Sequence, residues 1–186
     1  MKTKFAVLAL AIVAMSAPML IAGDKGKDPM VGGAAMYPTK DIIDNAVNSK
    51  DHTTLVAAVK AAGLVDTLKG PGPFTVFAPT NEAFAKLPAG TVDNLLKPEN
   101  KDTLTKILTY HVVAGRISAA DLKKQIKAGN GQATLKTVSG GTLTAMMQGG
   151  SIVLKDEKGG MSTVTIPNVF QSNGVIHVVD SVVLPN

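Results

Sequence analysis

Histidine is the residue type in this chain best suited to acid–base or metal chemistry, and the chain has three: His52, His111 and His177. His177 lies within the apolar run 175–179. Side chains alternate between the two faces of a strand, so His177 and Asp180, three positions apart, point to opposite faces. A regular strand therefore does not bring them together as a catalytic pair.

Metal binding requires more ligands than these histidines supply, since a metal site takes three or four in good geometry. The chain has no cysteine and no HExxH spacing. We predict no metal and no cofactor, and structural roles for His111 and His177. A buried neutral imidazole donates from one nitrogen and accepts at the other, so His177 is expected to link the last strand to a loop or to the Tyr110-His111 junction. His52 follows Asp51 at a predicted helix start and is expected on the surface.

Enzyme signatures are missing from the sequence. The segment around Ser151 lacks the second glycine of a GxSxG nucleophile elbow. No cysteine nucleophile, P-loop or GxGxxG is present. The carboxylate pair Asp156-Glu157 lies in a Gly-flanked turn, where solvation explains it. We therefore predict that the protein is not an enzyme.

The N-terminal residues have the order of a secretory signal peptide. Two lysines precede an apolar run over 5–14, and small residues follow. The run is too short for a convincing membrane span. We predict a signal peptide over 1–23, a flexible leader over 24–37 and one folded domain over 38–186, with an uncleaved signal anchor as the alternative. The mature protein would have no transmembrane segment and would be secreted, periplasmic or extracellular.

Charge and composition argue against a nucleic-acid partner. The formal net charge is +5, and removal of residues 1–23 takes away two lysines and no acid, which leaves +3. The densest basic group, Lys123, Lys124 and Lys127, fits a solvated helix face. With no Trp and two Tyr there is no base-stacking platform. Without cysteine an exported domain has no disulfides, so its apolar core must stabilise it.

Helical periodicity dominates the first half of the chain and strand patterns the second. The segment 53–62 has an apolar stripe at helical spacing and ends at Gly63. From residue 132 onward, short alternating segments are separated by Gly-Gly pairs, a pattern typical of antiparallel sheet. The last strand, 175–180, is apolar on both faces, as in a strand buried between two layers. This order predicts an α+β fold.

Three stretches, taken in order, resemble the fasciclin, or FAS1, family. They are FTVFAPTNEAF over 74–84, Tyr-His-Val-Val over 110–113 and NGVIHVVDSVVLP over 173–185. The resemblance covers about residues 38–185. It implies a FAS1-like β-sandwich wedge with a helical layer, of the single-domain secreted bacterial type.

The motif residues have structural explanations in turn and cap chemistry. Pro79 removes a strand donor, Thr80 can cap the next helix and Asn81 can bond the local backbone. Asn173-Gly174 is a turn signal, because both residues tolerate positive φ. The full set of motif positions predicted to be structural is Phe77, Pro79, Thr80, Asn81, Phe84, Tyr110, His111, Asn173, Gly174, His177 and Asp180.

The resemblance also implies an adhesion or protein-interaction function, with a cell-surface or matrix protein or a polysaccharide as the partner. In animal fasciclin domains an integrin-binding segment with an aspartate precedes the second signature. This chain has Asn168 there, which offers no carboxylate to an integrin-bound cation. Pro167, Asn168, Val169 and Phe170 form the candidate partner surface, although core positions are favoured for Val169 and Phe170. The alternative is a small-ligand or polysaccharide binder of the envelope, and an envelope enzyme is the least favoured class.

Overall fold

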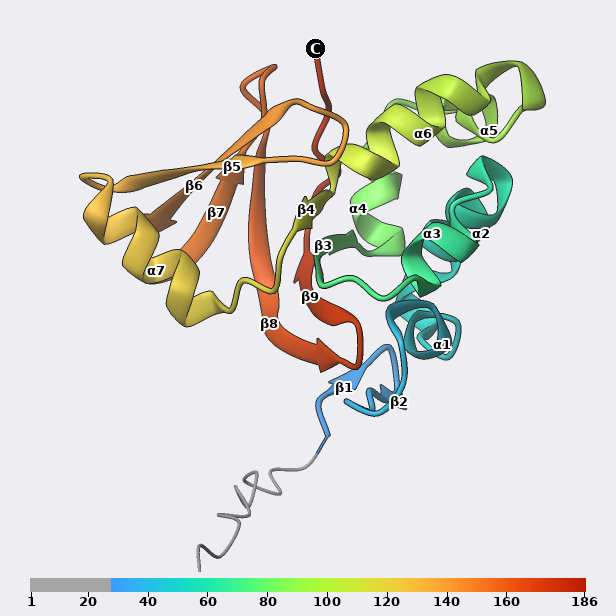
Figure 1. Cartoon of the computed structure of the whole chain (residues 1–186). Helices are drawn as coiled ribbons and strands as arrows, with labels where there is room; N and C mark the ends of the chain where they lie inside the picture. The colour runs from blue at the N-terminus through green and yellow to red at the C-terminus, as the bar shows by residue number, and fades with distance from the viewer. Residues whose placement is uncertain (1–27) are drawn as a thin grey trace, which may run out of the picture.

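The computed structural model of this protein describes residues 28–186, so the predicted signal peptide lies outside the described residues. The helices gather in the first half of the domain and the strands in the second, as predicted (Figure 1). In chain order the elements are β1 (Met30–Val31), β2 (Ala34–Ala35), α1 (Ile42–Ala46), η1 (Lys50–His52), α2 (Thr53–Ala62), α3 (Val65–Lys69), β3 (Phe74–Pro79), α4 (Asn81–Ala85), α5 (Thr91–Leu95), η2 (Pro98–Asn100), α6 (Lys101–Tyr110), β4 (Val112–Ala114), α7 (Ala119–Ala128), β5 (Gln132–Lys136), β6 (Thr142–Gln148), β7 (Ser151–Lys155), β8 (Met161–Gln171) and β9 (Gly174–Val179).

The main sheet has seven strands in the order β4-β3-β9-β8-β7-β6-β5. The hairpins that join β5 through β9 are antiparallel, as the Gly-rich pattern predicted. The central pair, β3 and β9, is parallel and runs from Phe74 opposite Gly174 to Pro79 opposite Val179. Sequence patterns did not predict this pair, because its two strands are separated along the chain by every element from α4 to β8.

The sheet curves until its two edge strands approach each other. Val113 of β4 forms an isolated antiparallel bridge with Thr137, directly after β5. The backbone N–H of Val138 also donates to the carbonyl of Val112 at 2.8 Å. These contacts pair backbone groups at both edges, which would otherwise be open to other chains.

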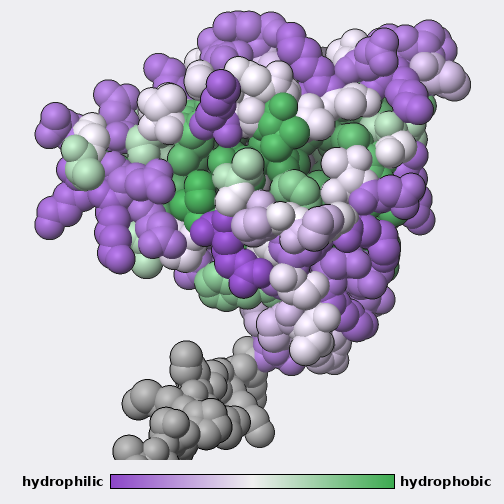
Figure 2. Space-filling view, in the orientation of Figure 1, coloured by the Kyte–Doolittle hydropathy of each residue, from purple (hydrophilic) through white to green (hydrophobic). Residues whose placement is uncertain are grey.

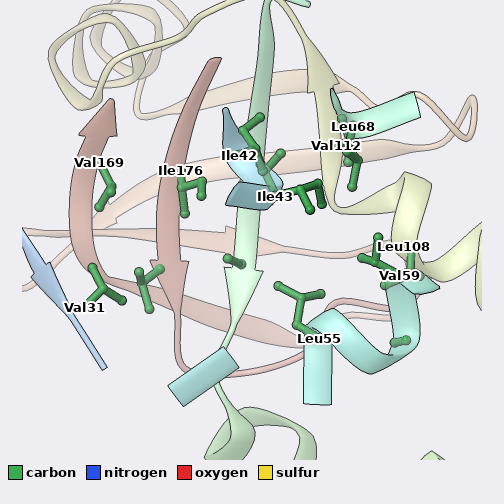
Figure 3. Close-up of a cluster of buried hydrophobic side chains, with 14 of the residues drawn as sticks. Val31, Ile42, Ile43, Leu55, Val59, Leu68, Leu108, Val112, Val169 and Ile176 are labelled. Atoms are coloured by element: carbon green, nitrogen blue, oxygen red, sulfur yellow. The ribbon is translucent and has the colours of Figure 1, made fainter. Parts of the chain in front are cut away.

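Two apolar clusters lie on opposite sides of the central strands. The first core lies between the sheet and α1, α2, α3 and α6, and Figure 3 shows Leu55 and Val59 of α2 in this cluster with Ile176 of β9. The second core lies inside the curved sheet, beneath α7, and includes Leu143 and Leu154. Every residue of β9 is buried, as predicted for the last strand. Each buried Val, Leu or Ile side chain contributes roughly 1.5–3 kcal/mol to folding.

The longer helices follow from local sequence. In α2, the buried residues Leu55, Ala58, Val59 and Ala62 recur at helical spacing. Gly63 ends α2 with φ 73°, a left-handed conformation that favours glycine.

The segment preceding α1 corrects the predicted leader. The sequence predicts a flexible leader over 24–37, but Met30–Val31 and Ala34–Ala35 pair as the β1–β2 hairpin. Val31 and Met36 are buried in the domain, and the Lys50 N–H donates to the Gly32 carbonyl at 3.1 Å. The physical reason is that these two apolar side chains complete the first core, a gain that local composition does not reveal.

The surface is polar over much of the face that Figure 2 shows. Figure 2 shows hydrophobic residues gathered in the valley between the sheet and the helices, surrounded by hydrophilic ones. Within residues 28–186, no helix combines the length and apolar character needed to cross a bilayer.

Gly174 gives a test of the central strand pair. Neither Asn173 nor Gly174 has the predicted positive φ. Glycine is required at 174 because a Cβ there would collide with the backbone carbonyl of Phe74 on β3.

We expect Gly174→Ala to lower the free energy of unfolding by about 3 kcal/mol, because backbone moves away less easily than a side-chain tip. Gly149→Ala is the matched control, since φ is 56° there and no atom lies within 4 Å of the added Cβ. It should cost about 1–2 kcal/mol. Urea denaturation of both variants makes the measurement, and equal losses would contradict this account.

Candidate functional site

The three signature stretches meet on the neighbouring strands β3 and β9 and at the α6–β4 junction. The Phe77 N–H donates to the His111 carbonyl at 2.9 Å. The Phe77 ring stacks on the His177 imidazole, with ring centroids 5.7 Å apart and planes inclined by 25°. Phe77 and His177 are also register partners in the parallel pair. Motifs separated by tens of residues in the chain therefore form one buried group.

His177 makes two hydrogen bonds from inside this group and is fully buried. Its Nδ1 accepts from the Asn168 N–H at 3.3 Å, so Nε2 carries the proton and donates to the Ile117 carbonyl at 2.9 Å. Burial lowers the pKa of His177, which keeps the ring neutral. The imidazole thus joins β9 to β8 and to the segment before α7, and not to the Tyr110-His111 junction.

His111 has the opposite tautomer. Its Nε2 accepts from the Val183 N–H at 3.1 Å, so Nδ1 carries the proton and donates to the Ile107 carbonyl at 2.8 Å. Complete burial lowers the pKa of His111 to about 4. The ring connects the end of α6 to the C-terminal segment after β9.

Tyr110 points to the other side of the α6–β4 junction, into the second core. Its hydroxyl donates to the Thr142 carbonyl at 2.5 Å and accepts from the Glu157 N–H at 3.2 Å. Burial raises the pKa of Tyr110 to about 12. The Tyr110 hydroxyl therefore joins the α6–β4 junction to β6 and to the turn between β7 and β8.

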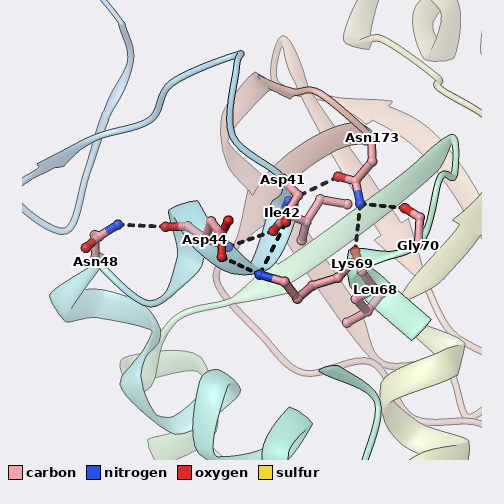
Figure 4. Close-up of polar contacts among 8 residues, drawn as sticks. All are labelled: Asp41, Ile42, Asp44, Asn48, Leu68, Lys69, Gly70 and Asn173. Carbon is pink, nitrogen blue, oxygen red and sulfur yellow. Dashed lines mark hydrogen bonds and ion pairs between the residues drawn. The ribbon is translucent and has the colours of Figure 1, made fainter. Parts of the chain in front are cut away.

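Asn173 holds three segments together (Figure 4). Its Oδ1 accepts from the Ile42 N–H at 3.1 Å, and its Nδ2 donates to the carbonyls of Leu68 and Gly70 at 2.7 and 2.9 Å. The side chain therefore supplies partners to the first turn of α1 and to the end of α3, a role that the turn prediction missed. Beside it, Lys69 forms ion pairs with both Asp41 and Asp44.

The first signature supplies caps for two helices. Thr80 Oγ1 accepts from the Ala83 N–H at 3.2 Å at the start of α4. The prediction that the Asn81 side chain bonds its local backbone is wrong. Its Oδ1 accepts from the Thr54 N–H at 3.0 Å and its Nδ2 donates to the Lys50 carbonyl at 2.8 Å, so it caps α2 from a distant position. The turn that follows Pro79, the last residue of β3, aims Asn81 at that helix, while Phe84 is buried in the first core.

Asp180 lies apart from the histidines at the end of β9. One carboxylate oxygen accepts from the Thr163 N–H at 2.8 Å, and the other lies 3.7 Å from Lys86 Nζ. His177 and Asp180 therefore have separate partners and do not form a pair.

His52 is buried, which contradicts its predicted surface position. Its exposed fraction is 3%, and its Nδ1 lies 2.9 Å from Ser49 Oγ. The prediction failed because the neighbouring Asp51 is exposed while the short helix η1 turns His52 inward. The spacing Ser49-x-x-His52 is the sequence signal that could have indicated this bond.

The candidate partner surface lies on an irregular part of β8, where the register with β9 shifts between Ile166 and Val169. Asn168 has φ 61°, and its Oδ1 accepts from the Ala119 N–H at 2.8 Å. Val169 is buried in the first core, so it is removed from the surface set. Phe170 is 39% exposed, which contradicts the core position favoured for it. Adjacent strand residues point to opposite faces, and the register shift before Val169 determines which of the two faces inward.

The two buried motif histidines have no free ring nitrogen. His111 and His177 each use both ring nitrogens in bonds to the backbone. In the described part of the chain, no three His, Asp or Glu side chains lie close enough to hold a metal ion.

Comparison with known proteins gives the context for this geometry. The family model described as Fasciclin domain matches residues 50–185. Protein sll1483 of Synechocystis is 49% identical over 159 residues, which cover 86% of this chain and 81% of the relative. The immunogenic protein MPB70 of Mycobacterium bovis is 37% identical over 199 residues, which cover 98% and 94%.

Two further matches cover less than two thirds of the other protein. The cell surface glycolipoprotein MPB83 of M. bovis is 32% identical over 168 residues, which cover 90% of this chain and 65% of that one. The solved FAS1 domain pair of the insect cell adhesion molecule fasciclin I has a TM-score of 0.69 at 21% identity. That match covers 79% of this chain and 51% of the pair, so the chain spans about half of that structure.

The two bonds of His177 predict its contribution to stability. We expect His177→Leu to lower the free energy of unfolding by about 2–4 kcal/mol, because it leaves the Ile117 carbonyl and the Asn168 N–H buried without partners. His177→Gln, which retains a donor and an acceptor, should recover part of the loss. Chemical denaturation at pH 7 makes the measurement, and a Leu variant as stable as the parent would contradict the role assigned to His177.

Acid should destabilise the fold through His111. The unfolded chain binds a proton at this residue below its ordinary pKa of 6.5, whereas the folded chain does so only near 4. The contribution of neutral His111 to the free energy of unfolding is therefore complete above pH 6.5. As the pH falls toward 4, this contribution decreases by about 3 kcal/mol. His111→Gln should be less stable at pH 7 but should lose less on acidification. Unfolding free energies measured from pH 7.5 to 4 test this, and parallel pH curves for the two proteins would contradict it.

Proposed function

The chain belongs to the fasciclin domain family, and on this premise we propose that it is an exported adhesion or protein-interaction module of the cell envelope or extracellular space, without catalytic activity. Its partner is a protein or polysaccharide of a cell surface or matrix. The name of MPB83, a cell surface glycolipoprotein, supports this location, and the signal-peptide pattern over 1–23 agrees with it.

The observation that carries the proposal is the exposure of Phe170 on β8. Large aromatic side chains are usually buried, and at protein interfaces they supply much of the binding energy. Pro167, also exposed, adds a second apolar side chain on the same irregular segment. We assign the partner surface to these two residues, and Val169 no longer belongs to it.

Asn168 holds this surface in place. Its left-handed backbone conformation turns the chain within the bulge, and its two bonds, to Ala119 and His177, join the bulge to the start of α7 and to β9. A contact surface on a fixed backbone loses little conformational entropy on binding. Asn168 itself is assigned this positioning role, since its Oδ1 already accepts a hydrogen bond.

Affinity capture tests the proposal with a matched pair of variants. The purified protein is immobilised and exposed to envelope and extracellular fractions of the source organism across a salt series. We expect one saturable partner, retained at moderate salt because the contact is apolar. Phe170→Ser should reduce its capture at least tenfold, as expected when an aromatic anchor is removed.

Met161→Ser is the control, because Met161 is an exposed apolar residue at the other end of β8, with an exposed fraction of 45%. It should leave capture unchanged. Capture that is insensitive to Phe170→Ser would overturn the assigned surface. The absence of any saturable partner for the folded parent protein would overturn the adhesion function.

A further inference from the structure

Positive charge is concentrated in one part of the described chain. Residues 103–155 contain seven lysines and arginines and one acid, which gives a net charge of 7 − 1 = +6. The remainder of residues 28–186 contains eight lysines and twelve acids, which gives 8 − 12 = −4. The nearly neutral domain therefore has two regions of opposite charge, and the basic region attracts anionic partners.

Four of these seven cations lie on α7 and on the segment that leads into it. Lys123, Lys124 and Lys127 are exposed and share one face of the helix, because residues three and four positions apart are neighbours. Arg116 is also exposed, three residues before α7. We call these four residues the basic stripe. The ion pairs found within residues 28–186 involve none of them, so their charges are available to a partner.

The one acid of this region has a local role in the helix. Asp121 completes a capping box, in which its Oδ2 accepts from the Ser118 N–H at 3.1 Å and from the Ser118 hydroxyl at 2.7 Å. These bonds hold the pKa of Asp121 below its ordinary value. The carboxylate also lies in the first turn of α7, where the helix dipole favours a negative charge. Asp121 therefore offsets the basic stripe only in part.

An open hollow of about 300 Å³ lies beside the stripe. It is lined by Arg116, Ile117, Asp121, Lys124 and Gln125. The lining thus combines two cations with a carboxamide, a carboxylate and one apolar side chain. An acidic sugar has the matching groups, since its carboxylate can pair with the cations and its hydroxyls can bond the amide and the carboxylate. A simple anion would leave the amide and the carboxylate without partners.

Arg116 connects this hollow to the surface assigned to Phe170. Its Nη2 donates to the carbonyls of Gln171 and Ser172, at 2.8 and 3.0 Å, directly after Phe170 in the chain. These two bonds fix one end of the guanidinium. Its remaining N–H groups are held in a planar fork that suits a carboxylate.

Phe170 and the hollow lie on the same side of the sheet. Phe170 is the register partner of Val175, and Val175 is the register partner of Thr75, so these three side chains share a face. Thr75 Oγ1 donates to the Gly115 carbonyl at 2.7 Å and accepts from the Ile117 N–H at 2.9 Å. The segment that contains Arg116 therefore lies over the face to which Phe170 belongs.

We propose that the basic stripe and its hollow bind an acidic polysaccharide, with one carboxylated sugar unit in the hollow and further units along α7. The inference rests on the proposed interaction function and names the chemistry of its partner. The ten residues of α7 span about 15 Å, so a polymer with repeated charges can contact the whole stripe, whereas one sugar contacts only the hollow. Beyond Arg116 the same polymer reaches Phe170.

Titration calorimetry of the purified protein tests the proposal with polygalacturonate and with the methyl-esterified form of the same polymer, in calcium-free buffer. We expect polygalacturonate to bind saturably and the esterified polymer not to bind, because esterification removes the charge and keeps the ring hydroxyls. Binding should weaken as the salt concentration rises, since ions screen exposed charges, and should level off at the contribution of Phe170. Equal binding of the two polymers, or binding of neither, would overturn the proposal.

Two other anionic probes separate an acidic sugar from charge alone. Polyglutamate presents carboxylates on a polypeptide, and vesicles of phosphatidylglycerol with phosphatidylcholine present an anionic surface. We expect both to bind roughly tenfold more weakly than polygalacturonate, because neither brings ring hydroxyls to Gln125 and Asp121. If either probe bound as tightly as polygalacturonate, the assignment to a polysaccharide would be wrong.

Charge-reversal variants locate the site. Lys124→Glu should weaken polygalacturonate binding roughly tenfold, because it replaces attraction with repulsion beside the hollow. Lys136→Glu is the matched control, since Lys136 is exposed on β5 and points away from the second core, to which its neighbour Leu135 belongs. It makes the same change in net charge and should alter the affinity by about twofold or less. Equal effects of the two folded variants would overturn the basic stripe as the site.

Failure of this inference differs from failure of the interaction function. In the affinity capture described above, a saturable partner that is lost in Phe170→Ser but retained in full by Lys124→Glu would overturn the acidic polysaccharide and leave the interaction function standing. A captured partner that both variants lose, and that polygalacturonate displaces, would support the two proposals together.

Discussion

The parallel pairing of β3 with β9 is the contact on which the rest of the structure depends. The paired residues Phe74 and Gly174 are 174 − 74 = 100 positions apart in the chain, and both strands are almost completely buried. Together they separate the first core from the second, so each strand supplies side chains to both. Their approach is close enough to require glycine at 174, opposite Phe74. A long loop must close before this pair can form, so its cost in entropy is repaid only when both cores assemble around it.

Neutral histidines connect this central pair to the surrounding chain. His111 and His177 have opposite tautomers, and each is set by a backbone N–H that donates to one nitrogen and a carbonyl that accepts from the other. Buried polar groups that are fully paired favour one arrangement of the chain over its alternatives. These hydrogen bonds occupy both ring nitrogens of His111 and His177. The two histidines therefore stabilise the fold and have no nitrogen available for acid–base chemistry or metal binding. His52 differs, because its Nε2 makes no hydrogen bond within residues 28–186.

The partition between interior and surface is clearest in β8. A regular strand would give Val169 and Phe170 alternating faces, but the register shift and the left-handed Asn168 decide which face is inside. Val169 enters the first core and Phe170 meets solvent. Asn168, which has no carboxylate to bind a cation, instead determines the backbone conformation next to Val169 and Phe170. The proposed partner surface therefore depends on a local irregularity more than on the regular sheet.

The sequence by itself determined the α+β class, the helix with the Leu55–Ala62 stripe, the antiparallel hairpins and the resemblance to fasciclin domains, because these depend on local periodicity, turn residues and short motifs. The tertiary structure alone decided the parallel β3–β9 pair, the burial of Val31, Met36 and His52, and the long-range bonds of Asn81 and Asn173. Each of these depends on which distant segment lies opposite a residue. The position of a residue within a periodic pattern indicates which face of the helix or strand its side chain lies on. Its hydrogen-bond partner and its burial are determined only when distant segments pack together in the two cores.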